Sequence, residues 1–310
     1  MIASRKLLTN LKPSLILHFY EVALQEKILI FEARKQNIPS ILIQHGTPFL
    51  SYPDFHLLNS ILGILPLYQD KKIACWGSMV KDYAMKQGMD ENNVIVSGSI
   101  KHDDMFRMKQ KQYEKKGTIL IALGQLTSFK LESQSITTYE RYEKCLRIIC
   151  NALKKIPGRK KIAKLHPGEM VFRTVAVEPI IREIDPSIDI VVDADLGKLL
   201  QSADVIISIG LTTVLLEANI FEKPTITLVA DRLEFLSILS NGYTELFTDE
   251  EEDRFQKFLI DILADDKLRN EQIKKGLNFV SAYMANPGRA SEYLVQKIEH
   301  MVPSKTPSNT

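Results

Sequence analysis

The stretch SADVIISIGLTTVLLEANIFEKPTITLV, residues 202–229, decides the fold of this 310-residue chain. Residues 205–208 are a short, mostly β-branched run, typical of a buried parallel strand, and Gly210 ends it. Thr212 and Thr213 can cap the apolar helix that follows, and a Lys-Pro pair separates that helix from a second apolar strand. Strand, glycine turn, helix and strand in this order predict a parallel βαβ unit.

The turn of this predicted unit has the features of a phosphate site. The first turn of a helix offers unpaired backbone N–H groups and the positive end of the helix dipole, and two threonine hydroxyls lie beside them. Glu217 follows one turn later among apolar neighbours, where an unpaired carboxylate would be costly to bury. Two interpretations are open. Either this is a capped βαβ unit whose Glu217 pairs with a lysine, or it is a nucleotide site with phosphate at residues 210–213 and ribose hydroxyls on Glu217.

The composition is that of a globular protein long enough for two domains. Hydrophobic residues make up 45% and charged residues 25%, and the net charge of +2 gives no indication of nucleic-acid binding. The three cysteines form no CxxC pair, which argues against structural zinc and fits a reducing cytosol. No apolar run approaches the roughly 18 residues of a spanning helix, so we expect a cytoplasmic protein. The run LLNSILGILP at 57–66 either covers the core or lies on the inner face of a membrane.

Predicted strands alternate with predicted helices along most of the chain, which indicates parallel sheets with helices on both faces. The charged stretch 105–116 is the best candidate linker, and beyond residue 231 only helices are expected. We therefore expect an α/β protein with two doubly wound, Rossmann-like domains facing a cleft. The N-terminal domain would span 1–106 and the C-terminal domain 117–302. The polar residues 303–310 are expected to form a disordered tail.

The residues with chemical potential gather at the carboxyl ends of the predicted strands, where such sheets bind ligands. His45 follows one strand in the motif QHGTP, with Gly46 and Thr47 directly behind it. An imidazole there can take a proton from a hydroxyl nucleophile near neutral pH, or it can hydrogen-bond its own loop. We expect His45 to be the catalytic base, with Gly46 and Thr47 lining the cleft.

His166 has the same placement in the motif KLHPGE, where Pro167 stiffens the turn before a helix start. This motif either binds a phosphate or a base edge, or it is a structural turn. Lys164 lies two residues earlier on the same strand, so its side chain shares a face with His166 and can add positive charge. Gly124 and Gln125 end the first strand of the second domain and are further candidates for the cleft.

Three polar residues before the predicted linker have more than one interpretation. His102, in GSIKHDD, either lines the cleft or is a solvated loop residue, and we favour the second. Asp103 and Asp104 have the pattern of a paired-carboxylate metal site, but two exposed loop acids are the commoner case. No metal site and no cofactor are therefore expected.

Together these motifs resemble the two-domain GT-B glycosyltransferase superfamily, from about residue 13 to residue 298. The segments that carry the resemblance are IPSILIQHGTP, ACWGSMVKDYAMKQGMDENNVIVSGSIKHD, KLHP, SADVIISIGLTTVLLEANIFEKPTITL and PGRASEYLVQKI. The elements HGT, HP and SIGLTT are most similar to CDP-glycerol glycerophosphotransferases and capsule polysaccharide transferases. The His-Pro pair also resembles one that binds the nucleotide in bacterial sialyltransferases. The C-terminal half is similar to non-hydrolysing UDP-N-acetylglucosamine 2-epimerases.

The resemblance implies that the C-terminal domain binds a nucleotide-activated donor. It places His166, Pro167 and the turn at 210–213 on the base or phosphate and Glu217 on the ribose, with His45 as the base or acceptor-side contact. Helix N–H groups, threonine hydroxyls and nearby cations would stabilise charge on the leaving nucleotide without a metal. Two features depart from the family: the first domain is short, and an Ile-Gly-Leu-Thr-Thr sequence replaces the Asp-Tyr-Ser-Ser of the glycerophosphotransferases.

We therefore expect a transferase that moves a glycosyl or polyol-phosphate group from a nucleotide-sugar or CDP-polyol donor to a cell-envelope glycan or lipid-linked acceptor. Domain closure would bring His45 to the donor and exclude water. Two alternatives stay open. One is a UDP-N-acetylglucosamine 2-epimerase, although the acidic and arginine residues of that family's first-domain loop are not recognisable here. The other is a non-catalytic remnant that binds a nucleotide sugar.

Overall fold

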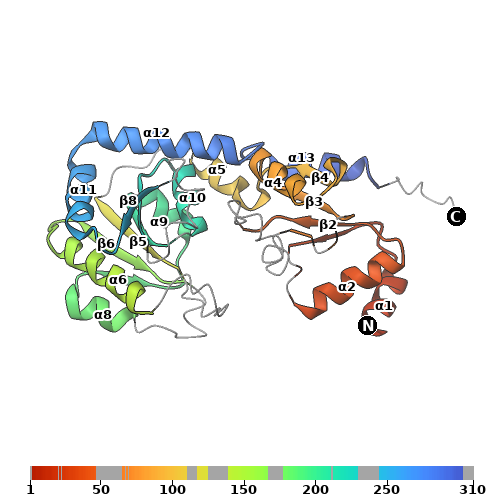
Figure 1. Cartoon of the computed structure of the whole chain (residues 1–310), viewed down its shortest axis with the longest axis horizontal. Coiled ribbons are helices and arrows are strands. Elements are labelled where there is room, and N and C mark those ends of the chain that lie inside the picture. Colours follow the sequence, from red (N-terminus) through yellow and green to blue (C-terminus); the bar gives the residue numbers. More distant parts are fainter. Residues whose placement is uncertain are drawn as a thin grey trace. The chain divides into compact units, whose positions relative to one another are not determined.

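The computed structural model describes residues 2–19, 21, 23–46, 65–66, 68, 70–109, 117–124, 139–166, 177–210, 212–229 and 244–302. Within them the chain forms two parallel β-sheets, of four and six strands, with helices packed against both (Figure 1). Two compact units result. Unit 1 comprises Met1–Asp104 and Ser281–Thr310, and unit 2 comprises Met105–Val280.

Unit 1 is built around a parallel sheet in the order β1-β2-β3-β4. The strands are β1 (Ile16–His18), β2 (Ser40–Ile43), β3 (Lys72–Cys75) and β4 (Val94–Val96). The helices are α1 (Ile2–Leu11), α2 (Leu24–Lys35), α4 (Ser78–Lys86) and α13 (Ala290–Glu299), with α5 (Asp103–Lys109) at the unit boundary. Ile41 and Ile43 of β2 share one apolar cluster with Leu294 of α13, so the last helix of the chain closes the core of the first unit.

The return of the chain to unit 1 depends on close backbone packing. A Cβ on Gly77 would lie 2.2 Å from the Tyr283 carbonyl oxygen, and one on Gly98 would lie 2.1 Å from that of Ala285. Only glycine fits at these two strand ends, because any larger residue would overlap the backbone. The Asp103 carboxylate also accepts hydrogen bonds from the first N–H groups of α13. These contacts assign residues 281–302 to unit 1, although the sequence placed them in the C-terminal domain.

Unit 2 is built around a parallel sheet in the order β10-β9-β8-β5-β6-β7. The strands are β5 (Thr118–Leu123), β6 (Lys160–Lys164), β7 (Asp189–Val191), β8 (Ala203–Ile209), β9 (Thr225–Val229) and β10 (Glu245–Thr248). The helices are α6 (Tyr139–Lys154), α8 (Val177–Ile184), α9 (Leu196–Ser202), α10 (Thr213–Ile220), α11 (Glu252–Ala264) and α12 (Asp266–Tyr283), the last of which ends in unit 1. The strands run β5-β6-β7 to one side and β8-β9-β10 to the other, so the strand order reverses between β5 and β8.

The central strand β5 contributes to two cores. Ile119, Ile121 and Leu123 pack on the face that α6, α8 and α11 cover, whereas Leu120 and Ala122 pack on the face of α9 and α10. Successive side chains of a strand point to opposite faces, and burial on both faces requires the unbroken apolar run TILIAL. Strand β5 is therefore a central strand of the sheet that is buried on both faces.

The sequence patterns did not predict three elements. Helix α5 occupies the first part of the predicted linker, because Met105 and Met108 pack against the core of unit 2. Strand β10 follows residue 231, where only helices were expected, and α1 precedes β1. Most of the run 57–66 and the whole of 303–310 lie outside the described residues, so the predictions made for them stay predictions. Within the described part of the chain, no helix has both the length and the apolar character needed to cross a membrane.

Candidate functional site

Three of the predicted site residues lie level at one edge of unit 2. In the register of the sheet, Ala122 of β5 lies between its partners on β6 and β8. Two residues further along these three strands come Gly124, His166 and Gly210. Gly124 and Gly210 follow the two strands between which the strand order reverses. Open α/β sheets bind their ligands beyond the strand ends at such a switch point.

Gly210 turns the chain from β8 toward α10. Its φ is +67°, which lies in the left-handed region that favours glycine. Its N–H donates to the Leu228 carbonyl at 2.8 Å, and its own carbonyl accepts a hydrogen bond from the Ser208 hydroxyl at 3.1 Å. The turn is therefore held on one side by β9 and on the other by Ser208.

A chain of buried hydroxyl groups supports this turn. Ser208 Oγ lies 3.0 Å from Thr227 Oγ1, which lies 3.1 Å from Thr244 Oγ1. Each hydroxyl has a single proton to donate. Because Ser208 donates to the Gly210 carbonyl, Thr227 must donate to Ser208, and Thr244 to Thr227. Ser208 and Thr227 were not singled out from the sequence, although each is a polar residue inside an apolar strand, VIISI and TITLV respectively. Thr244 was not singled out either.

Helix α10 begins directly after the turn. The Thr212 hydroxyl accepts a hydrogen bond from the Val214 N–H at 3.3 Å, which confirms that Thr212 caps this helix. Thr213 is its first residue and is half-buried. Glu217 lies one turn further on and is only 2% exposed, as its apolar neighbours predict. The helix N-terminus, with its positive dipole end, thus follows the switch point directly.

The β6 side of the same edge carries positive charge. Lys164 Nζ donates to the Val192 carbonyl at 2.8 Å, which fixes the ammonium group at the carboxyl ends of β6 and β7. His166 is exposed. Directly after the adjacent strand β5, the Gly124 carbonyl accepts a hydrogen bond from the Tyr142 hydroxyl of α6 at 3.3 Å. An imidazole, an ammonium group and a helix N-terminus along one sheet edge are suited to an anion.

In unit 1, His45 follows the carboxyl end of β2, and the buried Gln44 fixes its turn. Gln44 Nε2 donates to the Gly46 carbonyl at 2.8 Å, and Gln44 Oε1 accepts from the Trp76 N–H at 2.7 Å. The Trp76 indole N–H in turn donates to the Gln44 carbonyl at 2.9 Å. Gln44 was not singled out from the sequence, although an amide at the end of an apolar strand was a signal. It ties the turn of His45 to the end of β3.

The environment of His45 keeps its imidazole neutral at pH 7. Burial lowers the pKa of His45 below its usual 6.5; the hydrogen bond to the Phe19 carbonyl raises it in part, and the Lys101 ammonium lowers it further. A neutral imidazole can accept a proton, which is what the predicted base requires.

The expectations for His102 and Asp103 as solvated loop residues are wrong. His102 is fully buried, with Nδ1 2.6 Å from Ser99 Oγ and its ring edge-on to Trp76 at 5.1 Å. It packs inside unit 1, and its place as a residue of the cleft stays a prediction. Asp103 is 1% exposed and binds the start of α13, whereas Asp104 is exposed as expected.

Thr47, Gln125 and Pro167 lie outside the described residues, so their predicted roles in the site stay predictions. In the part of the chain that the structure describes, no group of three or more His, Cys, Asp or Glu side chains is placed to hold a metal ion. The expectation that the protein needs no metal likewise stays a prediction.

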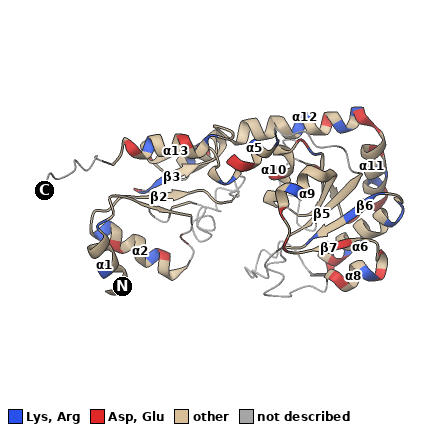
Figure 2. Ribbon diagram, turned by 180° about the vertical axis from the view of Figure 1, so that it is seen from behind, with Lys and Arg blue, Asp and Glu red and all other residues tan. Residues whose placement is uncertain are grey.

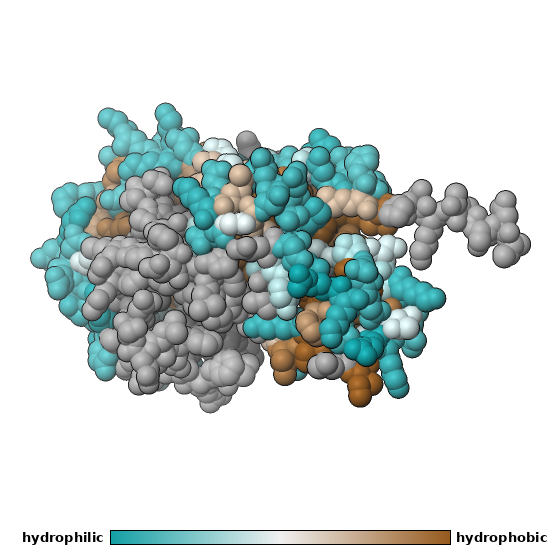
Figure 3. All heavy atoms as spheres, turned by 45° about the vertical axis from the view of Figure 1, so that its right-hand side comes forward, coloured by the Kyte–Doolittle hydropathy of each residue, from teal (hydrophilic) through white to brown (hydrophobic). Residues whose placement is uncertain are grey.

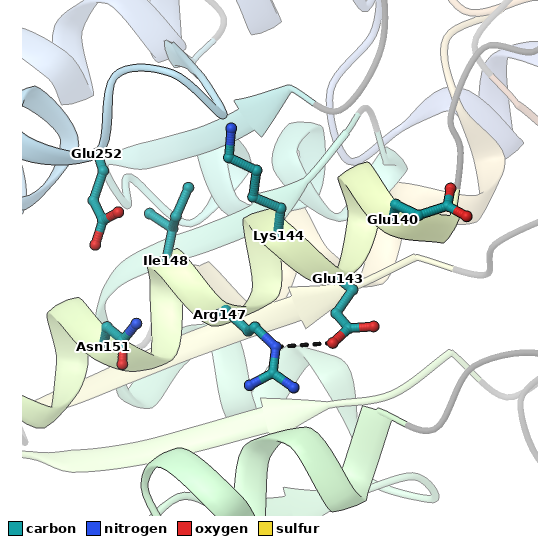
Figure 4. A pocket seen from close by; sticks show the side chains of 7 residues that line it. All are labelled: Glu140, Glu143, Lys144, Arg147, Ile148, Asn151 and Glu252. Carbon is teal, nitrogen blue, oxygen red and sulfur yellow. Dashed lines mark hydrogen bonds and ion pairs between the residues drawn. The ribbon is translucent and has the colours of Figure 1, made fainter.

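The surface pocket of Figure 4 contains none of the predicted site residues. It has a volume of about 310 Å³ and is lined by Glu140, Glu143, Lys144, Arg147, Ile148, Asn151 and Glu252. Arg147 bonds to Glu143 at 2.8 Å and to Glu183 at 3.2 Å. Ligand pockets are mostly apolar with a few polar groups, whereas this pocket is lined mainly by charged side chains on two helix surfaces. We assign it no ligand.

No protein-family model matches the sequence, and no curated protein matches it. Solved structures match the fold. A putative UDP-N-acetylglucosamine 2-epimerase from Listeria monocytogenes has a TM-score of 0.69 at 14% identity, over 97% of this chain and 77% of its own. A UDP-GlcNAc 2-epimerase from Neisseria meningitidis, solved with UDP-GlcNAc, has a TM-score of 0.65 at 17% identity, over 96% and 79%. A glycosyltransferase from Rickettsia africae has a TM-score of 0.56 at 14% identity, over 98% and 81%.

Identities this low show the fold alone. The two parallel sheets, the smaller of them in unit 1, match across nearly the whole chain in both epimerases and glycosyltransferases. The chain therefore has the GT-B fold, with two Rossmann-like domains.

Proposed function

We propose that this protein is an enzyme that uses a nucleotide-activated sugar, and that the nucleotide binds at the switch point of unit 2. The level alignment of Gly124, His166 and Gly210 carries the proposal, because it combines a glycine turn, an imidazole and the start of α10 at one edge. The UDP-GlcNAc bound in the Neisseria epimerase, which shares the fold, supports the choice of ligand class.

Each part of this edge has a role in the proposal. The positive dipole end of α10 attracts the phosphates, and Gly210 lets the ligand approach the backbone closely. Lys164 and His166 add positive charge or hydrogen-bond donors, and Glu217 accepts from the ribose hydroxyls. Preorganised donors of this kind stabilise the negative charge that develops on a leaving nucleotide. The proposal assigns that stabilisation to the protein and not to a metal.

We place group transfer first among the possible reactions. His45 takes the proton of an acceptor hydroxyl while the oxygen of that hydroxyl attacks the transferred group. The bond between this group and the nucleotide phosphate breaks, and the nucleotide leaves. The acceptor in this proposal is a cell-envelope glycan or a lipid-linked sugar, handled in the cytoplasm. The lowered pKa of His45 supports the role, because the imidazole is unprotonated at pH 7.

Epimerisation is the second candidate. The two epimerase structures have TM-scores of 0.69 and 0.65, against 0.56 for the glycosyltransferase. An epimerase converts its nucleotide sugar without an acceptor, and this property separates the two reactions.

Calorimetric titration with CMP, UDP, GDP and their sugars tests the proposal. We expect one base to bind at micromolar to low millimolar concentration, and Gly210→Ala to weaken that binding, because alanine is strained at φ +67°. The preferred donor is then followed by NMR, alone and with a mixture of envelope glycans. Conversion of the donor alone selects the epimerase, and consumption only with acceptor selects the transferase. The proposal falls if no nucleotide binds at millimolar concentration.

A further inference from the structure

We propose that helix α1 docks unit 1 on an anionic membrane surface. The docking surface consists of Leu7 and Leu11, one helical turn apart on the same face of α1, with the neighbouring Lys6 and Lys12. The two leucine side chains are 50% and 66% exposed, and Leu8 is the one buried residue of the helix. The inference does not depend on the proposed function.

Exposed apolar side chains concentrate at this end of the chain. Of the eleven large hydrophobic residues that are exposed in the described part of the chain, seven lie between residues 2 and 31. Leu17 of β1 and Leu24 of α2 are among them. Figure 3 shows apolar surface on the part of unit 1 that carries α1 and α2. An apolar surface that folding leaves uncovered marks an interaction site.

The exposed charge at this surface is positive. The first 20 residues contain Arg5, Lys6 and Lys12 and no Asp or Glu. The next acids along the chain are Glu21, which is 1% exposed, and Glu26, which is half-buried. Arg5 reaches the buried Glu32 at 3.0 Å, which anchors α1 on α2 and leaves the lysines to face outward. Figure 2 marks the basic residues of this end in blue.

The combination of apolar and basic side chains on α1 favours an anionic bilayer as the partner. A helix of ten residues with one buried side chain gains little from its own protein, because short helices are marginal without packing. Exposed Leu beside Lys is the pattern of helices that lie in the interface of a bilayer, with lysines on the anionic headgroups. Two copies of the same basic surface would repel each other, so a second copy of this chain is a poorer partner.

Co-sedimentation of the full chain with vesicles tests the inference. We expect binding to vesicles of phosphatidylcholine with 30% phosphatidylglycerol, at least tenfold weaker binding to pure phosphatidylcholine, and loss of binding as salt is raised. Leu7→Gln with Leu11→Gln, and separately Lys6→Glu with Lys12→Glu, should each reduce binding at least tenfold. Ile260→Gln and Val295→Gln remove exposed apolar residues of α11 and α13, and serve as controls that keep binding.

Two results would overturn the inference. One is equal binding to both kinds of vesicle, or binding that neither double variant reduces. The other is a dimer in sedimentation velocity that Leu7→Gln with Leu11→Gln dissociates, because the surface would then join two copies. Thermal melting of each variant checks the fold, and the lysine pair provides the test even if the leucine pair unfolds.

Discussion

Asp103 and Ser291, separated by 188 positions, are joined by two hydrogen bonds: Asp103 Oδ2 accepts from the Ser291 N–H at 2.8 Å and from its hydroxyl at 2.6 Å. Asp103 Oδ1 accepts from the Ala290 N–H at 3.0 Å. A carboxylate at a helix N-terminus bonds the free N–H groups and complements the helix dipole. A carboxylate two positions before unit 2 thus caps the helix that follows unit 2.

Replacing Asp103 with Asn should therefore destabilise unit 1. Hydrogen bonds to a charged group contribute about 1.5–3 kcal/mol, and we expect a loss of that size in the free energy of unfolding. Urea unfolding measures it. Asp104→Asn changes the adjacent exposed carboxylate and should stay within about 0.5 kcal/mol of the natural protein. Equal effects of the two variants would show that the cap contributes nothing.

Ser208→Ala should weaken nucleotide binding by loosening the Gly210 turn. The change removes the donor to the Gly210 carbonyl and leaves the Thr227 hydroxyl without its acceptor, at a cost of about 1–3 kcal/mol in stability. Calorimetry should show lower affinity for the best nucleotide. Ser202→Ala is the matched control, because that hydroxyl bonds to the Leu199 carbonyl within α9. Unchanged nucleotide affinity in Ser208→Ala would show that the chain of hydroxyl groups does not contribute to nucleotide binding.

Glu217→Gln should keep the fold and weaken nucleotide binding. The substitution preserves the shape of the side chain and removes the charge that accepts from two ribose hydroxyls in the proposal. Charge-assisted bonds contribute roughly 1.5–3 kcal/mol each, so the loss in affinity should exceed tenfold. A dissociation constant within twofold of the natural protein would remove Glu217 from the site.

Alanine substitutions of His45 and His166 should impair different properties of the protein. His45→Ala should lower turnover by roughly 10²–10⁴, the usual contribution of a positioned base, with little change in nucleotide affinity. His166→Ala should weaken nucleotide binding first. Steady-state kinetics and calorimetry on the two variants give the comparison. The opposite pattern would reverse the roles of the two units. If neither variant changes turnover or nucleotide affinity, both histidines have only a structural role in their turns.

The pH dependence of turnover should report His45. Its pKa lies below 6.5 because of burial, so the imidazole is in its basic form above that pH. Activity should therefore show an acid limb whose midpoint lies below pH 6.5, and it should fall as the pH decreases through the lowered pKa. The acid limb should disappear in the residual activity of His45→Ala. An acid limb with its midpoint above 6.5 would assign the titration to another group.

The sequence predicted the strands of both units well, because buried parallel strands require unbroken apolar runs. Apolar runs predict strands at 72–75, 94–96 and 118–123, and β3, β4 and β5 have these bounds. β8 and α10 belong to the unit predicted from residues 202–229. The short helix α1 and the short strand β10 were not predicted from the sequence. Helix α5 covers the first part of the predicted linker, where Met105 and Met108 pack against the core of unit 2 in a segment whose composition is mostly polar.

The placement of the candidate residues was predictable where they follow strand ends, and not where it depends on packing across the chain. Gly124, His166 and Gly210 lie at one edge of the sheet, as expected, because parallel strands bring their carboxyl ends together. The burial of His102 depends on Trp76 and Ser99, and local sequence carries no record of such a contact. Buried polar residues such as Gln44 and Ser208 were read as ordinary strand residues, although their burial requires partners.

The chain leaves unit 1 after residue 104 and returns at residue 281, which has a consequence for synthesis on the ribosome. The strands of unit 1 are made first, yet its core lacks Leu294 until the last helix has emerged. Unit 2 is one uninterrupted segment and has its complete core as soon as it is released. We therefore expect unit 2 to complete its core before unit 1, although the strands of unit 1 are made first.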